Sequence, residues 1–159
     1  APVLFFIHGG YWRSLDKADH SFIAPVFQQL GVCVVVINYA LCPAVTIPHI
    51  TLQVVQALAW THRHIAAHGG DPSRITVAGH SAGAHLASVL GLAQGDLPRH
   101  DPAKVDGVWA ISGIYDLAPL TGTTLNHKLR LDAEAARRQS PLLTATAAPS
   151  SSGPGRCVM

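Results

Sequence analysis

The fold of this chain is decided by one stretch near its middle, Val77-Ala78-Gly79-His80-Ser81-Ala82-Gly83-Ala84-His85-Leu86. An apolar run precedes the stretch and a helix-forming run continues it, so Ser81 stands where a strand would turn into a helix. The pattern Gly-x-Ser-x-Gly in this context is typical of a nucleophile elbow, a strained turn that lifts a serine hydroxyl out of a sheet. Glycine is expected at Gly79 and Gly83 because side chains there would collide with the neighbouring backbone. We therefore predict that Ser81 is a nucleophile; the alternative is an ordinary glycine-rich turn.

The same turn would place hydrogen-bond donors where charge develops when a serine attacks a carbonyl group. The backbone N–H of Ala82 and the positive end of the following helix would point at this oxyanion. Removing one such donor typically slows turnover by about 10²- to 10³-fold. We therefore assign Ala82 to a predicted oxyanion hole.

A second motif follows a short apolar run near the start of the chain, His8-Gly9-Gly10-Tyr11-Trp12. Glycines in such a loop let the main chain approach a substrate carbonyl without a side chain in the way. We predict that the N–H groups of Gly10 and Tyr11 complete the oxyanion hole, and that His8 and Gly9 shape the loop. Tyr11 and Trp12 are predicted to line an aromatic pocket. The alternative is a plain strand-to-loop glycine pair. We refer to residues 8–12 as the glycine loop and to residues 79–83 as the elbow.

Four apolar runs alternate with helical periods along the chain, which indicates parallel strands joined by crossover helices. We predict a doubly wound, mostly parallel α/β sheet of about four strands with helices on both faces, a three-layer α/β/α arrangement. The predicted elements are strand 3–7, helix 17–30, strand 32–37, helix 49–68, strand 74–78, a helix from the elbow to residue 92, strand 105–111 and a short helix at 132–139. Residues 1–141 would form this domain, and residues 142–159 a loose tail of low complexity.

Composition limits what the protein can bind. Of the 159 residues 48% are hydrophobic and 13% charged, with a formal net charge of +2. The basic residues form no stripe with aromatic residues, so nucleic-acid binding is not expected. No apolar stretch reaches about 18 residues and no signal peptide is visible, so we expect a cytoplasmic protein that does not enter a membrane.

Several residues receive a structural rather than a chemical interpretation. His64 and His68 could share a helix face, but no acidic or cysteine partner accompanies them, so we expect neither a metal nor another cofactor. Trp60 and Trp109 are expected in the core. We expect free thiols at the three cysteines, which are Cys33, Cys42 and Cys157. The alternative is a single disulfide.

Three stretches together resemble one branch of the α/β-hydrolases, the kynurenine formamidases (arylformamidases) and related esterases. They are the glycine loop, the elbow with its helix start, and Ser112-Gly113-Ile114-Tyr115-Asp116-Leu117. A further stretch is similar to a segment that such enzymes carry, Asn38-Tyr39-Ala40-Leu41-Cys42-Pro43. The resemblance runs from about residue 2 to residue 141. It implies hydrolysis of an aryl formamide or a small ester by a Ser-Asp-His triad without a metal.

The resemblance also implies where the partners of Ser81 lie. In α/β-hydrolases the acid and then the histidine follow the serine. Both would lie beyond the matched region, so we expect them to be absent from this chain, which leaves Asp116 and His127 as candidates by chain order alone. Because a serine without a base is a poor nucleophile at neutral pH, the alternative function is a truncated, non-catalytic chain. Unpaired sheet edges could then lead to self-association.

Overall fold

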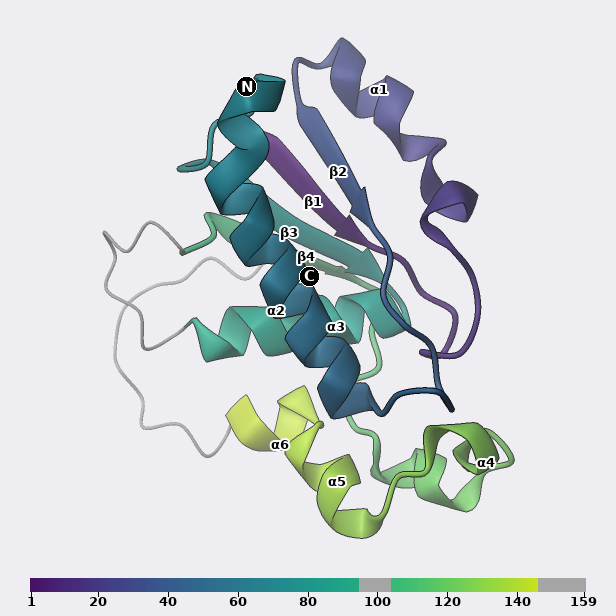
Figure 1. Cartoon of the computed structure of the whole chain (residues 1–159). Helices are drawn as coiled ribbons and strands as arrows, with labels where there is room; N and C mark the ends of the chain where they lie inside the picture. Colours follow the sequence, from purple (N-terminus) through teal and green to yellow (C-terminus); the bar gives the residue numbers. More distant parts are fainter. Residues whose placement is uncertain (95–103, 146–159) are drawn as a thin grey trace.

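The centre of the molecule is a parallel sheet of four strands in the order β2-β1-β3-β4 (Figure 1). The structure is a computed structural model, and it describes residues 1–94 and 104–145. The strands are β1 (Val3–Ile7), β2 (Cys33–Ile37), β3 (Ile75–His80) and β4 (Gly107–Ile111). The predicted parallel α/β sheet is therefore confirmed, with strand ends shifted by up to two residues.

The register of the sheet brings the two sequence motifs to the same edge. Ile7, the last residue of β1, pairs with Ile37 of β2 and with Gly79 of β3. The glycine loop leaves the sheet directly after Ile7, and the elbow begins at Gly79. Because parallel strands end at a common edge, loop and elbow start as neighbours.

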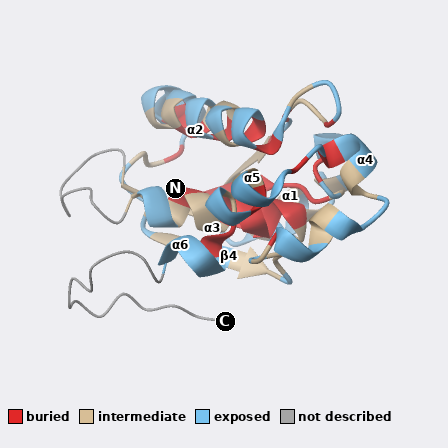
Figure 2. Ribbon diagram, turned by 90° about the horizontal axis from the view of Figure 1, so that it is seen from below, coloured by how far each residue is buried: buried red, intermediate tan, exposed pale blue. Residues whose placement is uncertain are grey.

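Helices cover both faces of the sheet, as the three-layer prediction required. The helix α1 (Ile23–Gln29) packs on a small cluster that includes Leu4 and Phe6. On the opposite face α2 (Ile47–His64) and α3 (Ala82–Ala93) enclose the main core. Figure 2 shows buried residues concentrated in the sheet and on the side of α2 that faces it.

Two of the predicted helices are divided. The range 17–30 contains a 3-10 turn, η1 (Lys17–His20), followed by α1, and the Asp16 side chain caps η1 by accepting from the Ala18 N–H. The range 49–68 contains most of α2, which begins at Ile47, and then a 3-10 turn, η2 (Ile65–His68). In both ranges at most two residues separate the 3-10 turn from the α-helix, so the apolar period continues across the break. Periodicity alone therefore predicted one helix in each range.

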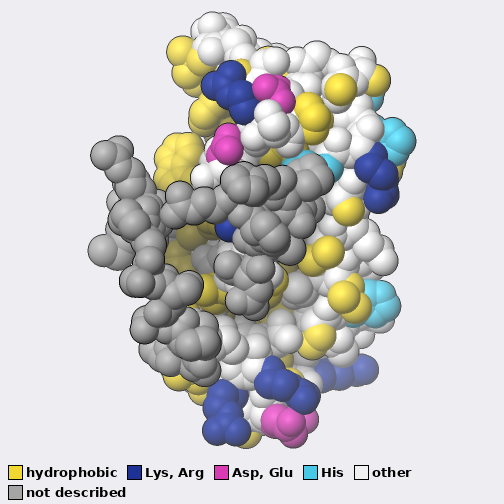
Figure 3. Space-filling view, turned by 90° about the vertical axis from the view of Figure 1, so that its left-hand side faces the viewer, with side chains coloured by type: hydrophobic (Ala, Val, Ile, Leu, Met, Phe, Trp, Pro, Cys, Tyr) yellow, Lys and Arg dark blue, Asp and Glu magenta, His cyan; other side chains and the backbone are white. Residues whose placement is uncertain are grey.

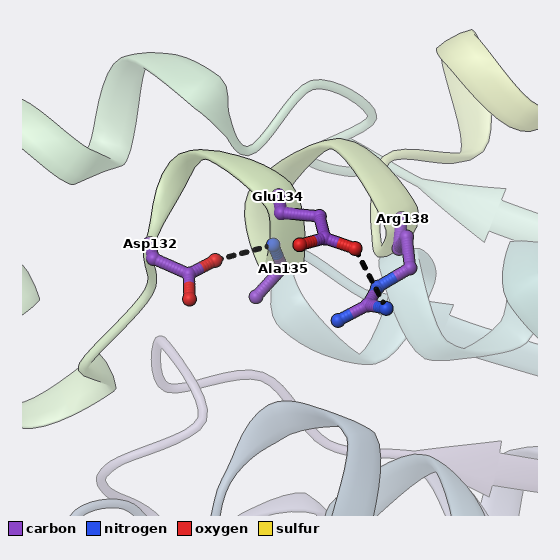
Figure 4. A network of polar contacts seen from close by, with 4 residues as sticks. All are labelled: Asp132, Glu134, Ala135 and Arg138. Carbon is purple, nitrogen blue, oxygen red and sulfur yellow. Dashed lines mark hydrogen bonds and ion pairs between the residues drawn. The ribbon is translucent and has the colours of Figure 1, made fainter.

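A group of short helices follows β4 and lies beyond the carboxyl ends of the strands in Figure 1. They are η3 (Ala118–Gly122), α4 (Asn126–Leu129), α5 (Ala133–Arg138) and α6 (Pro141–Ala145). The short helix predicted at 132–139 is confirmed as α5. Figure 4 shows its N-cap, where Asp132 accepts from the Ala135 N–H at 2.6 Å, and the surface ion pair of Glu134 with Arg138 at 3.0 Å.

The predicted tail starts too early. Residues 142–145 belong to α6, and the backbone N–H of Leu142 donates to the Tyr115 carbonyl at 3.0 Å, which fixes this helix to the segment after β4. The rest of the tail, residues 146–159, lies outside the described residues, as does Cys157. Cys33 and Cys42 are free thiols.

The expectation that Trp60 and Trp109 lie in the core is wrong. Their exposed fractions are 51% and 47%. Trp60 stands on the outer side of α2, where its ring contacts His64 at a centroid distance of 4.6 Å. Trp109 lies on β4, an edge strand of the described sheet. Its neighbour Val108 packs on α3, so Trp109 points to the opposite face, which α1 covers only near β1 and β2.

The two edges of the described sheet are β2 and β4, which each pair on one side only. Figure 3 shows one side of the molecule, where hydrophobic side chains lie in separate groups between charged residues at the two ends. Self-association through these edges stays a prediction. Among the described residues, no helix combines the length and the apolar character needed to cross a bilayer.

Candidate active site

The elbow is a sharp turn between β3 and α3, with Ser81 alone between the two elements. Ser81 has φ 56° and ψ −116°, a conformation that is costly for a residue with a side chain and that is frequent at functional sites. Its backbone N–H donates to the Ile111 carbonyl at 3.0 Å, and its carbonyl accepts from the His85 N–H at 3.1 Å. The strained turn is thus fixed from both sides, and the Ser81 residue is partly exposed.

The two glycines of the elbow have no room for a side chain. A Cβ on Gly79 would collide with the backbone of Gly83, and a Cβ on Gly83 would collide with the Ile7 carbonyl. These are the backbone collisions that the motif predicts. The start of α3 therefore lies in direct contact with the end of β1.

The glycine loop lies against the serine. A Cβ on Gly9 would stand 2.8 Å from the His80 carbonyl oxygen and 3.3 Å from the Ser81 Cβ. Gly10 has φ +107°, a conformation that favours glycine, and a Cβ there would collide with the Ser14 carbonyl. The loop therefore approaches the elbow with its main chain, as a loop that donates N–H groups must.

Three backbone N–H groups near Ser81 have no acceptor in the part of the chain that the structure describes. They belong to Gly10, Tyr11 and Ala82. Ala82 is the first residue of α3, so its N–H has no partner within the helix. An oxyanion hole made of these three donors stays a prediction.

Only one of the two aromatic residues predicted to line a pocket is accessible. Tyr11 has an exposed fraction of 43%, whereas Trp12 has none. The Trp12 indole is directed into the core, where its N–H lies 3.3 Å from His85 Nδ1. In this structure Trp12 is therefore a buried support of the glycine loop rather than a pocket wall.

Tyr39 braces the glycine loop, and sequence reasoning did not find it. Its hydroxyl donates to the His8 carbonyl at 2.8 Å and lies 3.3 Å from the Gly9 carbonyl. Burial raises the pKa of Tyr39, so the phenol stays protonated and donates. Its ring stacks on the His8 ring at a centroid distance of 4.3 Å. One signal was available, because Tyr39 follows the end of β2, the neighbour of β1.

His8 was predicted to shape the glycine loop, and its ring contacts that loop. Its ring is fully buried, and Nδ1 lies 2.8 Å from the Gly9 carbonyl, so Nδ1 carries the proton. Burial lowers the pKa of His8, although the hydrogen bond to the Gly9 carbonyl and nearby acidic groups oppose this. A neutral, buried His8 is a structural part of the loop.

The structure does not bring Asp116 and His127 together. Asp116 Oδ1 accepts from the Ala118 N–H, at the start of η3, at 2.9 Å and lies 3.5 Å from Ser140 Oγ. His127 is exposed on α4 and lines a shallow polar hollow with Thr123 and Asn126. Within residues 1–94 and 104–145, no hydrogen bond joins either side chain to Ser81. The Asp116 side chain thus has local partners at the start of η3 and at Ser140.

The histidines beside the elbow differ in access. His80 is exposed, and its Nδ1 would lie 3.5 Å from a Cβ on Gly9. His85 is buried, with both ring nitrogens in hydrogen bonds. No three His, Cys, Asp or Glu side chains of the described ranges are placed so that they could hold a metal ion.

Comparisons with known proteins agree with this geometry. A sequence profile of the alpha/beta hydrolase fold matches residues 4–150. The chain is 35% identical over 144 residues to kynurenine formamidase of Danio rerio, covering 88% of this chain and 46% of that protein. It is 37% identical over 124 residues to esterase LipQ of Mycobacterium tuberculosis, covering 74% of this chain and 29% of that protein.

Solved structures give the same result. The chain superposes on a protein from Silicibacter sp. TM1040 with a TM-score of 0.75 and 39% identity, covering 89% of this chain and 51% of the other. The chain spans about half the length of the kynurenine formamidase that it matches. The matched residues include the glycine loop and the elbow, so the predicted resemblance is confirmed. The chain belongs to the alpha/beta hydrolase fold family.

Proposed function

We propose that the protein is a serine hydrolase that cleaves a formamide or a carboxylic ester through Ser81. One observation carries the proposal: Ser81 stands at a strained turn between β3 and α3 with the glycine loop packed against it. The three N–H groups proposed to bind the oxyanion, those of Gly10, Tyr11 and Ala82, have no acceptor in the described chain. Preorganised donors of this kind usually make the largest single contribution to acyl transfer.

The reaction follows from these positions. Ser81 Oγ attacks the carbonyl carbon, while a general base takes the hydroxyl proton and later passes it to the leaving group. The carbonyl oxygen gains a negative charge that the N–H groups of Gly10, Tyr11 and Ala82 stabilise. The tetrahedral intermediate collapses and expels an amine or an alcohol, which takes up a proton and leaves the acyl group on Ser81. Water then releases the acid and restores the serine.

An aryl formamide or aryl ester is the favoured substrate class. Tyr11 is exposed beside the predicted oxyanion hole, and its ring could stack on an aromatic group of the substrate. The match to a kynurenine formamidase points in the same direction.

A second candidate function is a non-catalytic chain with the same ancestry. The observation that favours it is the separation of Asp116 and His127 from Ser81, because both have structural surroundings of their own. Without a base, serine hydrolases keep only about 10³- to 10⁴-fold acceleration over water from the oxyanion hole and binding. The two candidates therefore differ in rate by several orders of magnitude.

Covalent labelling separates the two. The full chain is treated with a fluorophosphonate probe, which phosphonylates an activated serine and releases fluoride. Ser81→Ala removes the proposed nucleophile. Ser112→Ala is the matched control, because Ser112 is exposed, has φ 50° and follows β4 at the same edge of the sheet.

We expect labelling of the wild type and of Ser112→Ala, and no labelling of Ser81→Ala. Turnover of an aryl formamide and of p-nitrophenyl acetate then measures whether Ser81 has the histidine base and the acid that a complete triad needs. An unlabelled wild-type chain would overturn the proposal and favour the non-catalytic candidate. Labelling without turnover would show that Ser81 is reactive but lacks the acid and base that complete the reaction.

A further inference from the structure

His85 is a buried histidine that the proposed reaction does not use. It lies one helical turn after Ser81 on α3 and has no exposed surface. Its Nδ1 is 3.3 Å from the Trp12 indole nitrogen, and its Nε2 is 2.6 Å from the Gln139 carbonyl oxygen. Because an indole N–H only donates and a carbonyl only accepts, Nδ1 is the acceptor and Nε2 carries the proton.

We propose that His85 is a positioning residue: it holds the glycine loop against the elbow through Trp12, and it joins that loop to the end of α5 through Gln139. The catalytic part of this inference rests on the proposed function, in which the glycine loop donates to the oxyanion. The structural part stands on the two hydrogen bonds and the burial of both rings.

The glycine loop needs such a support because its backbone is strained. Gly10, Tyr11 and Trp12 follow one another with φ values of 107°, 51° and 57°. Side-chain-bearing residues adopt this region at a cost, and they keep it only when their surroundings fix them. For Trp12 the surroundings are full burial, a hydrogen bond from the Cys42 N–H to its carbonyl at 2.8 Å, and His85.

His85 fixes the direction of the Trp12 ring as well as its depth. The two rings meet edge to face, with centroids 5.1 Å apart and an interplanar angle of 87°. An indole at this angle can donate to one ring nitrogen only in one orientation. A rotation of Trp12 would therefore move the adjacent Tyr11 N–H, one of the three proposed oxyanion donors.

The other side of His85 contacts the helices after β4. The Gln139 carbonyl that accepts from Nε2 belongs to the residue that ends α5. The next residue, Ser140, is buried, and its hydroxyl accepts from the Leu117 N–H at 2.8 Å. One imidazole thus connects the glycine loop, α3 and the segment that follows β4.

His85 is unsuited to act as the base for Ser81. Both ring nitrogens are engaged, and burial lowers its pKa to about 4, although the hydrogen bond to the Gln139 carbonyl opposes this shift. A neutral ring with fixed donor and acceptor sides serves positioning.

The test uses three substitutions that separate the two hydrogen bonds. His85→Leu removes both bonds and keeps an apolar side chain of similar volume. Trp12→Phe removes only the indole N–H. His85→Asn places an amide oxygen near the position of Nδ1 and can keep the acceptor for Trp12. The matched control is Leu90→Ala, which weakens the same helix at a buried site away from the glycine loop.

The first readout is the rate at which a fluorophosphonate labels Ser81 in the full chain. We expect His85→Leu and Trp12→Phe each to slow labelling by about 10- to 100-fold, below the full loss of an oxyanion donor. The double variant should be no slower than the slower single variant, because both substitutions break one interaction. His85→Asn should recover part of the rate, and Leu90→Ala should stay within about twofold of the wild type.

The second readout needs no reaction at Ser81. In nuclear magnetic resonance spectra, the Trp12 indole N–H should exchange slowly with solvent, unlike those of the exposed Trp60 and Trp109. His85→Leu should abolish this protection and shift the amide resonances of Gly10 and Tyr11, whereas Leu90→Ala should do neither. A wild type without labelling but with this signature would refute the proposed function and leave the positioning role standing.

Three results would overturn the inference. They are unchanged Gly10 and Tyr11 resonances in His85→Leu, multiplicative effects in the double variant, or equal slowing by Leu90→Ala. Each of them would reduce His85 to a residue that only fills the core.

Discussion

The elbow and the segment after β4, residues 112–145, carry the candidate nucleophile and the candidate acid and base, and they differ in how their backbone is packed. In the elbow, neither Gly79 nor Gly83 has space for a Cβ. In the segment after β4, Gly122 has nothing within 4 Å of the same position. All five residues of β1 beside the elbow are buried, whereas η3 has no buried residue.

The difference shows which part of the site local sequence can determine. The position of Ser81 follows from a turn of a few residues whose collisions permit one arrangement. The positions of Asp116 and His127 depend on how short helices dock on α3 and on each other. The part of the site that carries Ser81 is therefore fixed by close backbone packing. The part that carries Asp116 and His127 is held by side-chain contacts between short helices.

The largest difference in stability should come from replacing one glycine by alanine in the elbow and one in the segment after β4. Gly83→Ala forces a Cβ into the Ile7 carbonyl, so the contact of α3 with β1 must open. We expect the free energy of unfolding to fall by about 4 kcal/mol or more, a size that points to a specific steric cause. Gly122→Ala should change it by less than about 1 kcal/mol, since the site is open and φ is not left-handed. Urea denaturation of the two variants measures this, and equal stabilities would remove the distinction between the regions.

The next effect is a loss of stability in acid, which arises on the side of the glycine loop and the elbow. Burial lowers the pKa of His85 to about 4 and also lowers that of His8, from an ordinary value of 6.5. Between pH 6.5 and 4 the unfolded chain therefore binds more protons than the folded one. The stability from neutral histidines is complete above pH 6.5 and is lost as the pH falls toward 4. For His85 this amounts to about 3 kcal/mol.

Urea unfolding at pH 7 and pH 4.5 measures this dependence, and His85→Leu should show a smaller difference between the two pH values. A wild-type stability that is equal at both values would show that the buried histidines are protonated in the folded state.

Sequence reasoning predicted most of the fold, and it named Ser81 and the glycine loop as one side of a candidate site. The strands, the parallel order and the two collisions at Gly79 and Gly83 follow from local patterns, because each is decided within a few residues. The roles of Tyr39 and His85 could not be read in this way, since their partners lie 31 and 73 residues away, at His8 and Trp12.

Local patterns also failed to predict which tryptophans are buried. Trp12 was predicted at a pocket and lies in the core, whereas Trp109 was predicted in the core and is half exposed. A tryptophan's place depends on which helix covers its side of the sheet, and that is decided by tertiary packing. The same reason explains why Asp116, a candidate by chain order, bonds to the Ala118 N–H instead of reaching Ser81.

A smaller effect should come from relieving the strain at Ser81. Glycine tolerates φ 56° with ψ −116° far better than serine does. We expect Ser81→Gly to raise the free energy of unfolding by about 1 to 2 kcal/mol while it abolishes fluorophosphonate labelling. Ser81→Ala is the control, since it loses labelling without the gain in stability. Equal stabilities of the two variants would show that the turn stores no strain.

The smallest effect should come from the segment after β4, and it addresses the acid and base directly. Asp116→Ala removes the acceptor of the Ala118 N–H and should cost about 1 kcal/mol, whereas Asp116→Asn keeps an acceptor oxygen and should cost less. Neither variant, nor His127→Ala, should change the rate of Ser81 labelling by more than about twofold, because neither side chain contacts the elbow. A tenfold slower reaction in Asp116→Asn, with stability unchanged, would show that this carboxylate reaches the nucleophile. The segment after β4 would then supply the acid of the triad. The two regions would both take part in catalysis, and they would differ only in how rigidly their backbone is packed.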